Sequence, residues 1–223
     1  MPDYVPKQEL PLAAPSNGWS IFAGYGIKAE SSPYDFDLLE AELQYDLYLH
    51  PQHAITFSLL AGVGGKDHDH YVTRDGSLVA VTDNYDHLLL SFMTGYRFTQ
   101  PITKRLALEF GAKGGLTIHR LGVDKGRDWS RDYENVYDPD EGEWKRERTH
   151  HPSRHNVDVG FGYTAYAGLT FQVKANTRLH LGYALRSTNT RPKARPGTPE
   201  GDTPFRIEPM YWHVIHLGVT TAF

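Results

Sequence analysis

Eleven ionisable side chains recur at every second position of stretches whose other residues are mostly apolar. They are Glu40, Glu42, Asp46, Arg97, Glu109, Lys113, His119, Arg178, His180, Arg186 and His216. This mixture of carboxylates, imidazoles and cations suits a conducting polar path, a catalytic cluster or a network of salt bridges that fills an interior. Because an unpaired charge in a closed interior is costly, we favour a network of paired charges that plugs the interior.

Two short motifs contain residues that bind metals in other proteins. DHDH at 67–70 offers the carboxylate and imidazole ligands that suit zinc, nickel or copper. In a strand, however, both His side chains lie on one side and both Asp side chains on the other. DPDEGE at 138–143 has the oxygen-rich composition of a calcium loop but lacks its twelve-residue spacing. We therefore expect no metal site and no cofactor.

Two positions are candidates for acid–base catalysis. Asp86 stands next to His87, and His213 falls in the outward register of the last alternating stretch. Neither position belongs to a recognisable motif, and no Ser lies two residues from His213. We assign no catalytic residues and leave enzymatic activity open.

The elements that position these side chains are predicted to be β-strands. Apolar and polar residues alternate, as is typical of strands, at 19–30, 38–49, 54–64, 87–98, 105–119, 157–173, 178–187 and 211–223. The connections at 50–53, 99–104 and 174–177 are short, whereas those at 65–86, 120–156 and 188–209 are long and polar; the connection at 31–34 is also short. Eight antiparallel strands with tight turns at one end predict an all-β, up-and-down barrel with long hairpin loops at the other end.

The composition excludes several classes of protein. No window approaches 18 consecutive apolar residues, which excludes a transmembrane helix. The formal net charge of −4 provides no basic field for nucleic acid, and the absence of Cys excludes disulfides and thiolate metal sites. The first residues contain no apolar segment of a signal peptide. We expect a tail at 1–17 and one barrel domain at 18–223.

The sizes of the residues indicate which face of the barrel points outward. The polar faces are rich in Gly, which suits the narrow lumen of an eight-stranded barrel. The apolar faces hold large side chains that suit contact with lipid, and we expect an aromatic girdle near the tight-turn end. Its members are Tyr45, Tyr96, Phe98, Phe171 and Phe223. The barrel is therefore predicted to be transmembrane, and a soluble calycin-like binding barrel is the less favoured alternative.

The last strand is apolar at Ile215, Leu217 and Val219 and ends on Phe223, with Thr221 as a mild departure. This pattern resembles the C-terminal strand by which Gram-negative outer-membrane proteins are recognised for insertion. The eight-strand layout of the whole barrel region resembles the small OmpA and OmpX type barrels. The resemblance implies a bacterial outer-membrane location, periplasmic termini, and partners that include the barrel assembly machinery, outer-membrane lipids and lipopolysaccharide.

The function expected from this layout is that of an outer-membrane barrel with a plugged polar lumen. Its extracellular loops at 66–84, 122–155 and 188–209 are the expected sites of ligand contact, in surface interaction, adhesion or envelope integrity. An outer-membrane surface enzyme, either an omptin-like protease or a lipid A-modifying hydrolase, is the alternative.

Two of the long connections carry signals for projecting hairpins. Asp75-Gly76 lies between alternating segments, and counting outward from it pairs Ala54 with residue 97 or 98. In the third connection an acidic arm with Asp132 and Glu134 precedes a basic arm with Lys145, Arg146 and Arg148. We expect either a ribbon with opposite charges facing each other or a disordered charged loop.

Overall fold

The computed structural model describes residues 17–29, 36–74, 77–124, 133–138, 143–148, 154–194, 205–206 and 210–222. For 66–84, 123–124, 133–138, 143–148, 154–155, 193–194 and 205–206 it describes the backbone alone.

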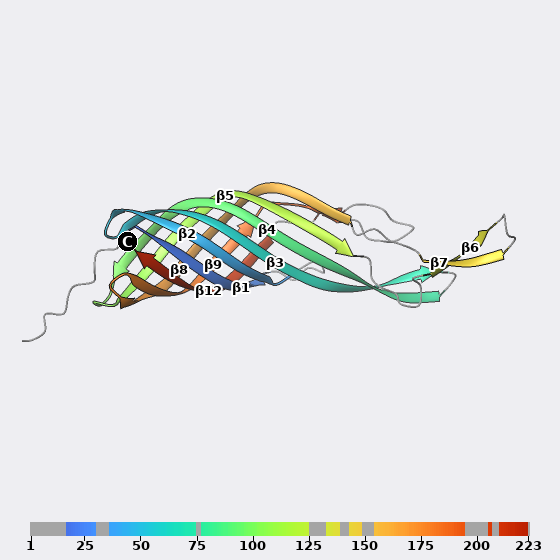
Figure 1. Ribbon diagram of the computed structural model, residues 1–223, viewed down its shortest axis with the longest axis horizontal. Coiled ribbons are helices and arrows are strands. Elements are labelled where there is room, and N and C mark those ends of the chain that lie inside the picture. Colours follow the sequence, from blue (N-terminus) through green and yellow to red (C-terminus); the bar gives the residue numbers. More distant parts are fainter. Residues whose placement is uncertain are drawn as a thin grey trace, which may run out of the picture.

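Eight strands form a closed antiparallel barrel (Figure 1). They are β1 (Gly18–Lys28), β2 (Leu38–His50), β3 (His53–Arg74), β4 (Ser77–Pro101), β5 (Leu106–Asp124), β8 (Arg154–Lys174), β9 (Thr177–Thr188) and β12 (Met210–Ala222). Each strand pairs with the next in this order, and β1 closes the barrel against β12 from Gly18↔Ala222 to Lys28↔Trp212. The predicted all-β, eight-stranded, up-and-down barrel is confirmed.

The hairpin of β3 and β4 extends far beyond the rest of the barrel. Its ladder runs from His53↔Phe98 to Arg74↔Ser77 and includes the predicted pair of Ala54 and Arg97. On its two flanks, β2 pairs with β3 only as far as Val63, and β5 pairs with β4 only as far as Asn84. The remainder is a two-stranded ribbon on the side away from the tight turns (Figure 1).

Two short ladders lie outside the barrel sheet. In the third long connection β6 (Tyr133–Asp138) pairs with β7 (Glu143–Arg148), and in the fourth β10 (Lys193–Ala194) pairs with β11 (Phe205–Arg206). The β6–β7 ladder is the predicted ribbon. Its register places Glu134 opposite Glu147, so the prediction of facing opposite charges is wrong at this position. Asp132 lies outside the described residues.

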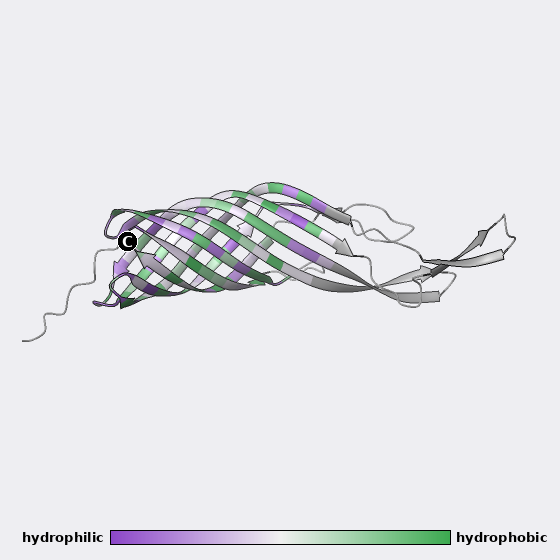
Figure 2. Ribbon diagram, in the orientation of Figure 1, coloured by the Kyte–Doolittle hydropathy of each residue, from purple (hydrophilic) through white to green (hydrophobic). Residues whose placement is uncertain are grey.

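Hydrophobic and hydrophilic residues alternate along the strands of the barrel (Figure 2), and the exposed outward set is apolar while the buried inward set is largely polar. Large apolar side chains such as Ile21, Phe92 and Leu217 are more than half exposed, while the alternate positions are buried. A calycin-like barrel would line its lumen with the apolar set, so that alternative is inconsistent with the structure. In the part of the chain that is described, no helix has the length and apolar character needed to cross a membrane.

Glycines in the polar register make room for large side chains inside the lumen. A Cβ atom at Gly182 would lie 2.2 Å from Nε2 of His216, and one at Gly111 would lie 2.3 Å from the hydroxyl of Tyr166. A methyl group at either position would displace the aromatic ring of the residue paired with it on the neighbouring strand. The enrichment of Gly on the polar faces therefore has a packing cause.

Candidate functional site

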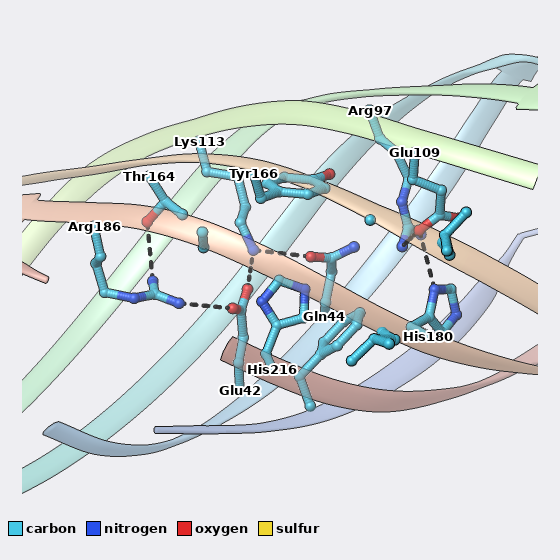
Figure 3. A pocket seen from close by; sticks show the side chains of 15 residues that line it. Glu42, Gln44, Arg97, Glu109, Lys113, Thr164, Tyr166, His180, Arg186 and His216 are labelled. Carbon is cyan, nitrogen blue, oxygen red and sulfur yellow. Dashed lines mark hydrogen bonds and ion pairs between the residues drawn. The ribbon is translucent and has the colours of Figure 1, made fainter. Parts of the chain in front are cut away.

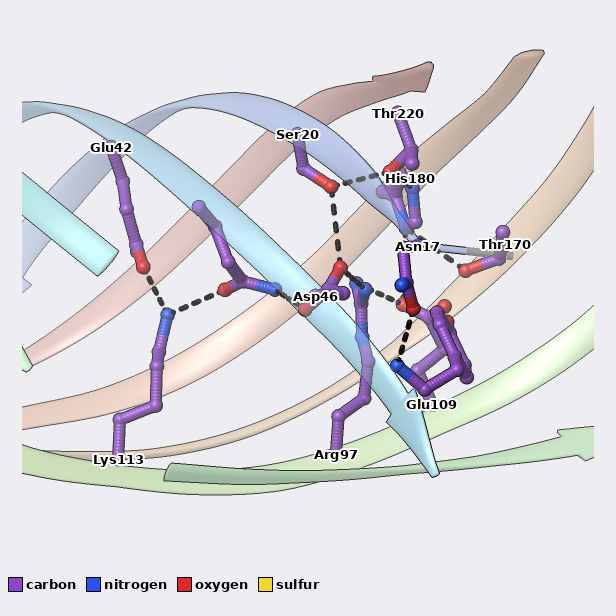
Figure 4. Close-up of polar contacts among 12 residues, drawn as sticks. Asn17, Ser20, Glu42, Asp46, Arg97, Glu109, Lys113, Thr170, His180 and Thr220 are labelled. Carbon is purple, nitrogen blue, oxygen red and sulfur yellow. Dashed lines mark hydrogen bonds and ion pairs between the residues drawn. The ribbon is translucent and has the colours of Figure 1, made fainter. Parts of the chain in front are cut away.

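The lumen is filled by a hydrogen-bonded network of charged side chains, which we call the lumenal network. Near the tight-turn end Arg97 donates to Asp46 through Nη1 and to Oε2 of Glu109 through Nη2, the latter at 3.0 Å. These three side chains come from β4, β2 and β5, and each is at most 5% exposed. One guanidinium thus forms ion pairs with two carboxylates on different strands (Figure 4).

A second cation extends the lumenal network toward the long-loop end (Figure 3). Lys113 forms an ion pair with Glu42 and donates to Oε1 of Gln44 at 2.9 Å. The amide nitrogen of Gln44 in turn donates to Oδ1 of Asp46 at 2.7 Å. Gln44 therefore joins the Lys113 and Arg97 clusters into one connected unit.

Arg186 lies at the end of the lumenal network that is nearer the long loops. Its Nη2 lies 2.7 Å from Oε1 of Glu40 and 3.4 Å from Oε2 of Glu42, and its Nη1 donates to the hydroxyl of Thr164 at 2.9 Å. Arg186 belongs to β9, whereas both carboxylates belong to β2. The ion pairs therefore span the interior of the barrel.

A histidine in the lumenal network has the arrangement of a nucleophilic triad. Nδ1 of His180 lies 3.0 Å from Oε2 of Glu109, and its Nε2 lies 2.5 Å from the hydroxyl of Thr220, which contacts Ser20 at 2.6 Å. The adjoining cavity has a volume of about 20 Å³. That space suits about one water molecule and is too small for a peptide or a lipid. At this level the side chains of the network fill most of the interior.

The structure brings together eight of the eleven predicted lumen residues. Glu40, Glu42, Asp46, Arg97, Glu109, Lys113, His180 and Arg186 are linked through the bonds described above. His216 lies beside them, with its ring edge-on to Phe22 at 5.5 Å. Arg178 is buried at the tight-turn end, and His119 lies apart at the opposite end.

The uncharged polar members of the lumenal network were missed by the sequence analysis. Ser20, Gln44, Thr164 and Thr220 all occupy the inward register of their strands. Tyr166 shares this register and places its ring 5.2 Å from the ammonium group of Lys113. Selecting every polar residue of the inward register, and not only the ionisable ones, would have found them.

Nearer the long loops the lumen changes character and is filled by an apolar layer. Its buried members are Phe36, Leu38, Tyr85, Leu89, Leu121, Ala184, Met210, Trp212 and Val214. The indole nitrogen of Trp212 donates to the backbone carbonyl of Phe36 at 3.2 Å, which fixes the segment before β2 inside the barrel. At this end the plug of the lumen is therefore apolar, whereas the predicted polar residues fill the lumen nearer the tight turns.

Two histidines lie at the edge of the apolar layer. The ring of His87 stacks on Phe36 with centroids 3.6 Å apart, and its Nδ1 lies 2.9 Å from Nε2 of His119. Nδ1 of His119 contacts the hydroxyl of Thr190 at 3.2 Å. His87 points into the barrel, whereas the neighbouring Asp86 is exposed on the other face. Consecutive strand residues point to opposite faces, so these two side chains do not form a catalytic pair.

His213 lies on the outer face of the barrel, as its register predicts. The hydroxyl of Tyr183 is hydrogen-bonded to Nδ1 of His213, and the two rings stack with centroids 5.9 Å apart. Toward the tight-turn end, the hydroxyl of Tyr96 is bonded to His53 in the same way. A tyrosine therefore satisfies one polar atom of both His213 and His53.

The remaining candidate residues lie in the last strand and the loops. Ile215, Leu217 and Val219 of the expected insertion signal are exposed on the outer face, while Phe223 lies outside the described residues. Of DHDH at 67–70 only the backbone is described, and 139–142 of the acidic turn lie outside the described residues. Among the described side chains, no three His, Asp or Glu are grouped as metal ligands.

Comparisons with known proteins agree with the fold. The sequence matched no family of known proteins and no curated protein. Among solved structures, Neisserial surface protein A is 13% identical, with 93% of this chain and 97% of that chain aligned at a TM-score of 0.51. Ail, the attachment invasion locus protein of Yersinia pestis, is 14% identical over 94% of this chain and 99% of that chain at a TM-score of 0.46. Outer membrane protein W of E. coli is 13% identical over 94% and 99% at a TM-score of 0.40. The chain thus has the fold of the eight-stranded outer-membrane β-barrel proteins.

Proposed function

We propose that this chain is a bacterial outer-membrane protein whose barrel is a closed anchor for ribbons displayed at the cell surface. The observation that carries this proposal is the filled lumen, in which Arg97, Lys113 and Arg186 are each paired with carboxylates of the same chain. An open aqueous pore needs a wider barrel whose polar lining remains hydrated. The interior is occupied by its own side chains, which leaves the projecting hairpins as the parts available to a partner.

The apolar band around the barrel supports a membrane location. Trp19, Tyr96 and Phe171 are exposed near the tight turns, and Tyr25 and Tyr183 are exposed farther along the strands. Aromatic residues at two levels around an apolar wall are typical of a transmembrane barrel. We propose that the tight turns and both termini are periplasmic, with residues 1–17 as a tail before the barrel domain at 18–223.

The outward register of β12 supports insertion by the barrel assembly machinery. On the outer face of β12, between β1 and β9, the side chains of Ile215, Leu217 and Val219 form a continuous apolar row. We propose that these residues, together with Phe223, form the insertion signal. On the long-loop side the same apolar band is proposed to contact lipopolysaccharide.

The β3–β4 ribbon is the proposed surface element. Its ladder continues without a break from inside the barrel wall to Arg74↔Ser77, so the wall positions the ribbon. We propose that 66–84, 122–155 and 188–209 contact an extracellular partner in surface interaction, adhesion or envelope integrity. The description of one structural neighbour as a surface protein agrees with this role.

Shortening the ribbon tests the proposal. Residues 67–84 are replaced by Asn-Gly, which keeps the Lys66↔Tyr85 pair in register, and the control deletes residues 2–16 of the proposed periplasmic tail. We expect both variants to fold, with the same shift in gel mobility on boiling as the intact protein. Attachment of expressing cells to host cells should fall only with the β3–β4 variant. Unchanged attachment, together with unchanged detergent resistance of the cells, would contradict a surface role for this ribbon.

A further inference from the structure

Among the described residues, the three tight turns at one end of the barrel carry exposed positive charge and no Asp or Glu. We define the turn rim as 49–53, 99–105 and 173–177, all of which the structure describes. Lys104, Arg105 and Lys174 are exposed there, and these three stretches contain no Asp or Glu. The turn rim is therefore a surface of one sign.

The opposite end of the barrel has a mixed charge. Lys28, Arg120 and Arg191 lie near that end, but so do acidic side chains that are exposed or half-buried. These acids are Asp37, Asp86 and Asp158. The positive sign is therefore a property of the turn rim and not of the barrel ends in general.

Each turn has an exposed aliphatic side chain, which lies beside the basic groups in the second and third turns. Ile102 is 51% exposed two residues before Lys104, and Val173 is 49% exposed directly before Lys174. In the first turn Leu49 is 69% exposed beside His50. These aliphatic side chains continue the outward apolar band. A basic group at the edge of such a band lies where the headgroups of a bilayer meet its hydrocarbon.

Backbone hydrogen bonds link the neighbouring turns into one rigid surface. Thr99 N donates to the carbonyl of Gln52 at 2.9 Å, which joins the first and second turns. Gln172 N donates to the carbonyl of Arg105 at 2.8 Å, which joins the second turn to the start of the third. The backbone positions that carry the basic side chains are thus fixed before any ligand binds, which lowers the entropy cost of binding.

We propose that the turn rim binds the phosphate groups of anionic phospholipids in the leaflet on its side of the membrane. The proposal rests on the membrane location proposed above. Positive charge favours an anion, and the exposed Ile102 and Val173 favour one that carries acyl chains over a free ion. Lys104, Arg105 and Lys174 would contact the headgroups while the aliphatic side chains lie among the first methylene groups.

Lipid retention measured by native mass spectrometry tests this inference. The folded protein is released from bilayers of equal phosphatidylglycerol and phosphatidylcholine. We expect it to retain phosphatidylglycerol about fivefold or more over phosphatidylcholine, which is roughly the effect of one basic residue near an anionic surface. The triple variant Lys104→Gln, Arg105→Gln, Lys174→Gln should lower this ratio to near one. The matched control Lys28→Gln, Arg120→Gln, Arg191→Gln should keep it.

Each outcome decides a different point. If both triple variants keep the intact ratio, or if the control loses as much as the rim variant, the turn rim is not the lipid site. If inorganic phosphate at the same concentration displaces the lipid, the site is one for a free anion and the inference is wrong. Folding in pure phosphatidylcholine, measured by gel mobility before and after boiling, tests the membrane location separately. A protein that folds without detergent or lipid would overturn both proposals.

Discussion

Lys113 and Glu42 form a salt bridge across the lumen between strands that are not neighbours in the sheet. Lys113 belongs to β5 and Glu42 to β2, and β3 and β4 separate them around the wall. The pair therefore joins opposite parts of the barrel rather than adjacent strands. Its energetic role can be separated from its geometric role by substitution.

Removing one partner of the Lys113–Glu42 pair should lower the stability of the protein much more than removing both partners. Lys113→Met leaves the buried Glu42 with a reduced set of partners, and we expect a loss of about 3 to 5 kcal/mol in the free energy of unfolding. The double variant Lys113→Met, Glu42→Leu should recover most of that loss, because neither charge then remains buried. Urea unfolding in lipid vesicles measures both values. Equal losses in the single and double variants would show that the pair has no special coupling.

Arg97 should be the most sensitive position of the lumenal network. Arg97→Met leaves both Asp46 and Glu109 without their shared cation, and we expect a loss of about 3 to 5 kcal/mol or failure to fold at neutral pH. Arg120→Met, on the exposed face of β5, is the control and should change the stability by less than about 1 kcal/mol. A loss at Arg97 no larger than that at Arg120 would contradict the pairing.

Gly182 should be required because a larger residue at this position would clash with the side chain of His216. Gly182→Ala brings a methyl group into contact with His216, and we expect overpacking to cost about 1 to 3 kcal/mol. Adding His216→Ala removes the ring and should restore much of the stability lost through the clash. A double-mutant cycle by urea unfolding gives the coupling energy. Additive losses would mean that His216 moves aside freely.

The apolar layer and the lumenal network should act as two separate closures. Trp212→Ala opens a cavity in the apolar layer and should cost about 3 to 5 kcal/mol in stability. The conductance of a planar bilayer should nevertheless stay near that of the intact protein, because the lumenal network below it is unchanged. Large ohmic conductance in this variant alone would show that the lumenal network does not close the barrel.

The wall of the barrel could be predicted from the sequence because each strand has a strict period of two. Alternation assigned Ile215 and Leu217 to one face and His216 to the other, and the Asp75-Gly76 signal gave the correct partner for Ala54. The register of β4 and β5 was wrong. Taking 99–104 as the turn places Gly95 near Glu109, whereas the ladder pairs Gly95 with Lys113, because it continues to Pro101↔Ala107 and the turn is centred farther along the chain.

The contents of the lumen were only partly predictable. Charges in the inward register identify the residues that need partners, but which charges meet depends on the width and stagger of the closed barrel. The apolar layer was missed because Phe36 comes from a connection and not from a strand. Trp212 and Leu38 could have indicated the apolar layer, since both are large apolar residues in the inward register.

The long sequence separation of the ion pairs links chain closure to charge neutralisation. Arg186 and Glu40 are 146 residues apart, and the bonded hydroxyls of Ser20 and Thr220 are 200 apart. Such contacts form late, because the intervening chain must first be ordered. Until β1 pairs with β12, the charged side chains of the lumen must remain hydrated. The hydrated charges therefore oppose complete entry of an open sheet into the bilayer, and the pairing of the two terminal strands removes that opposition.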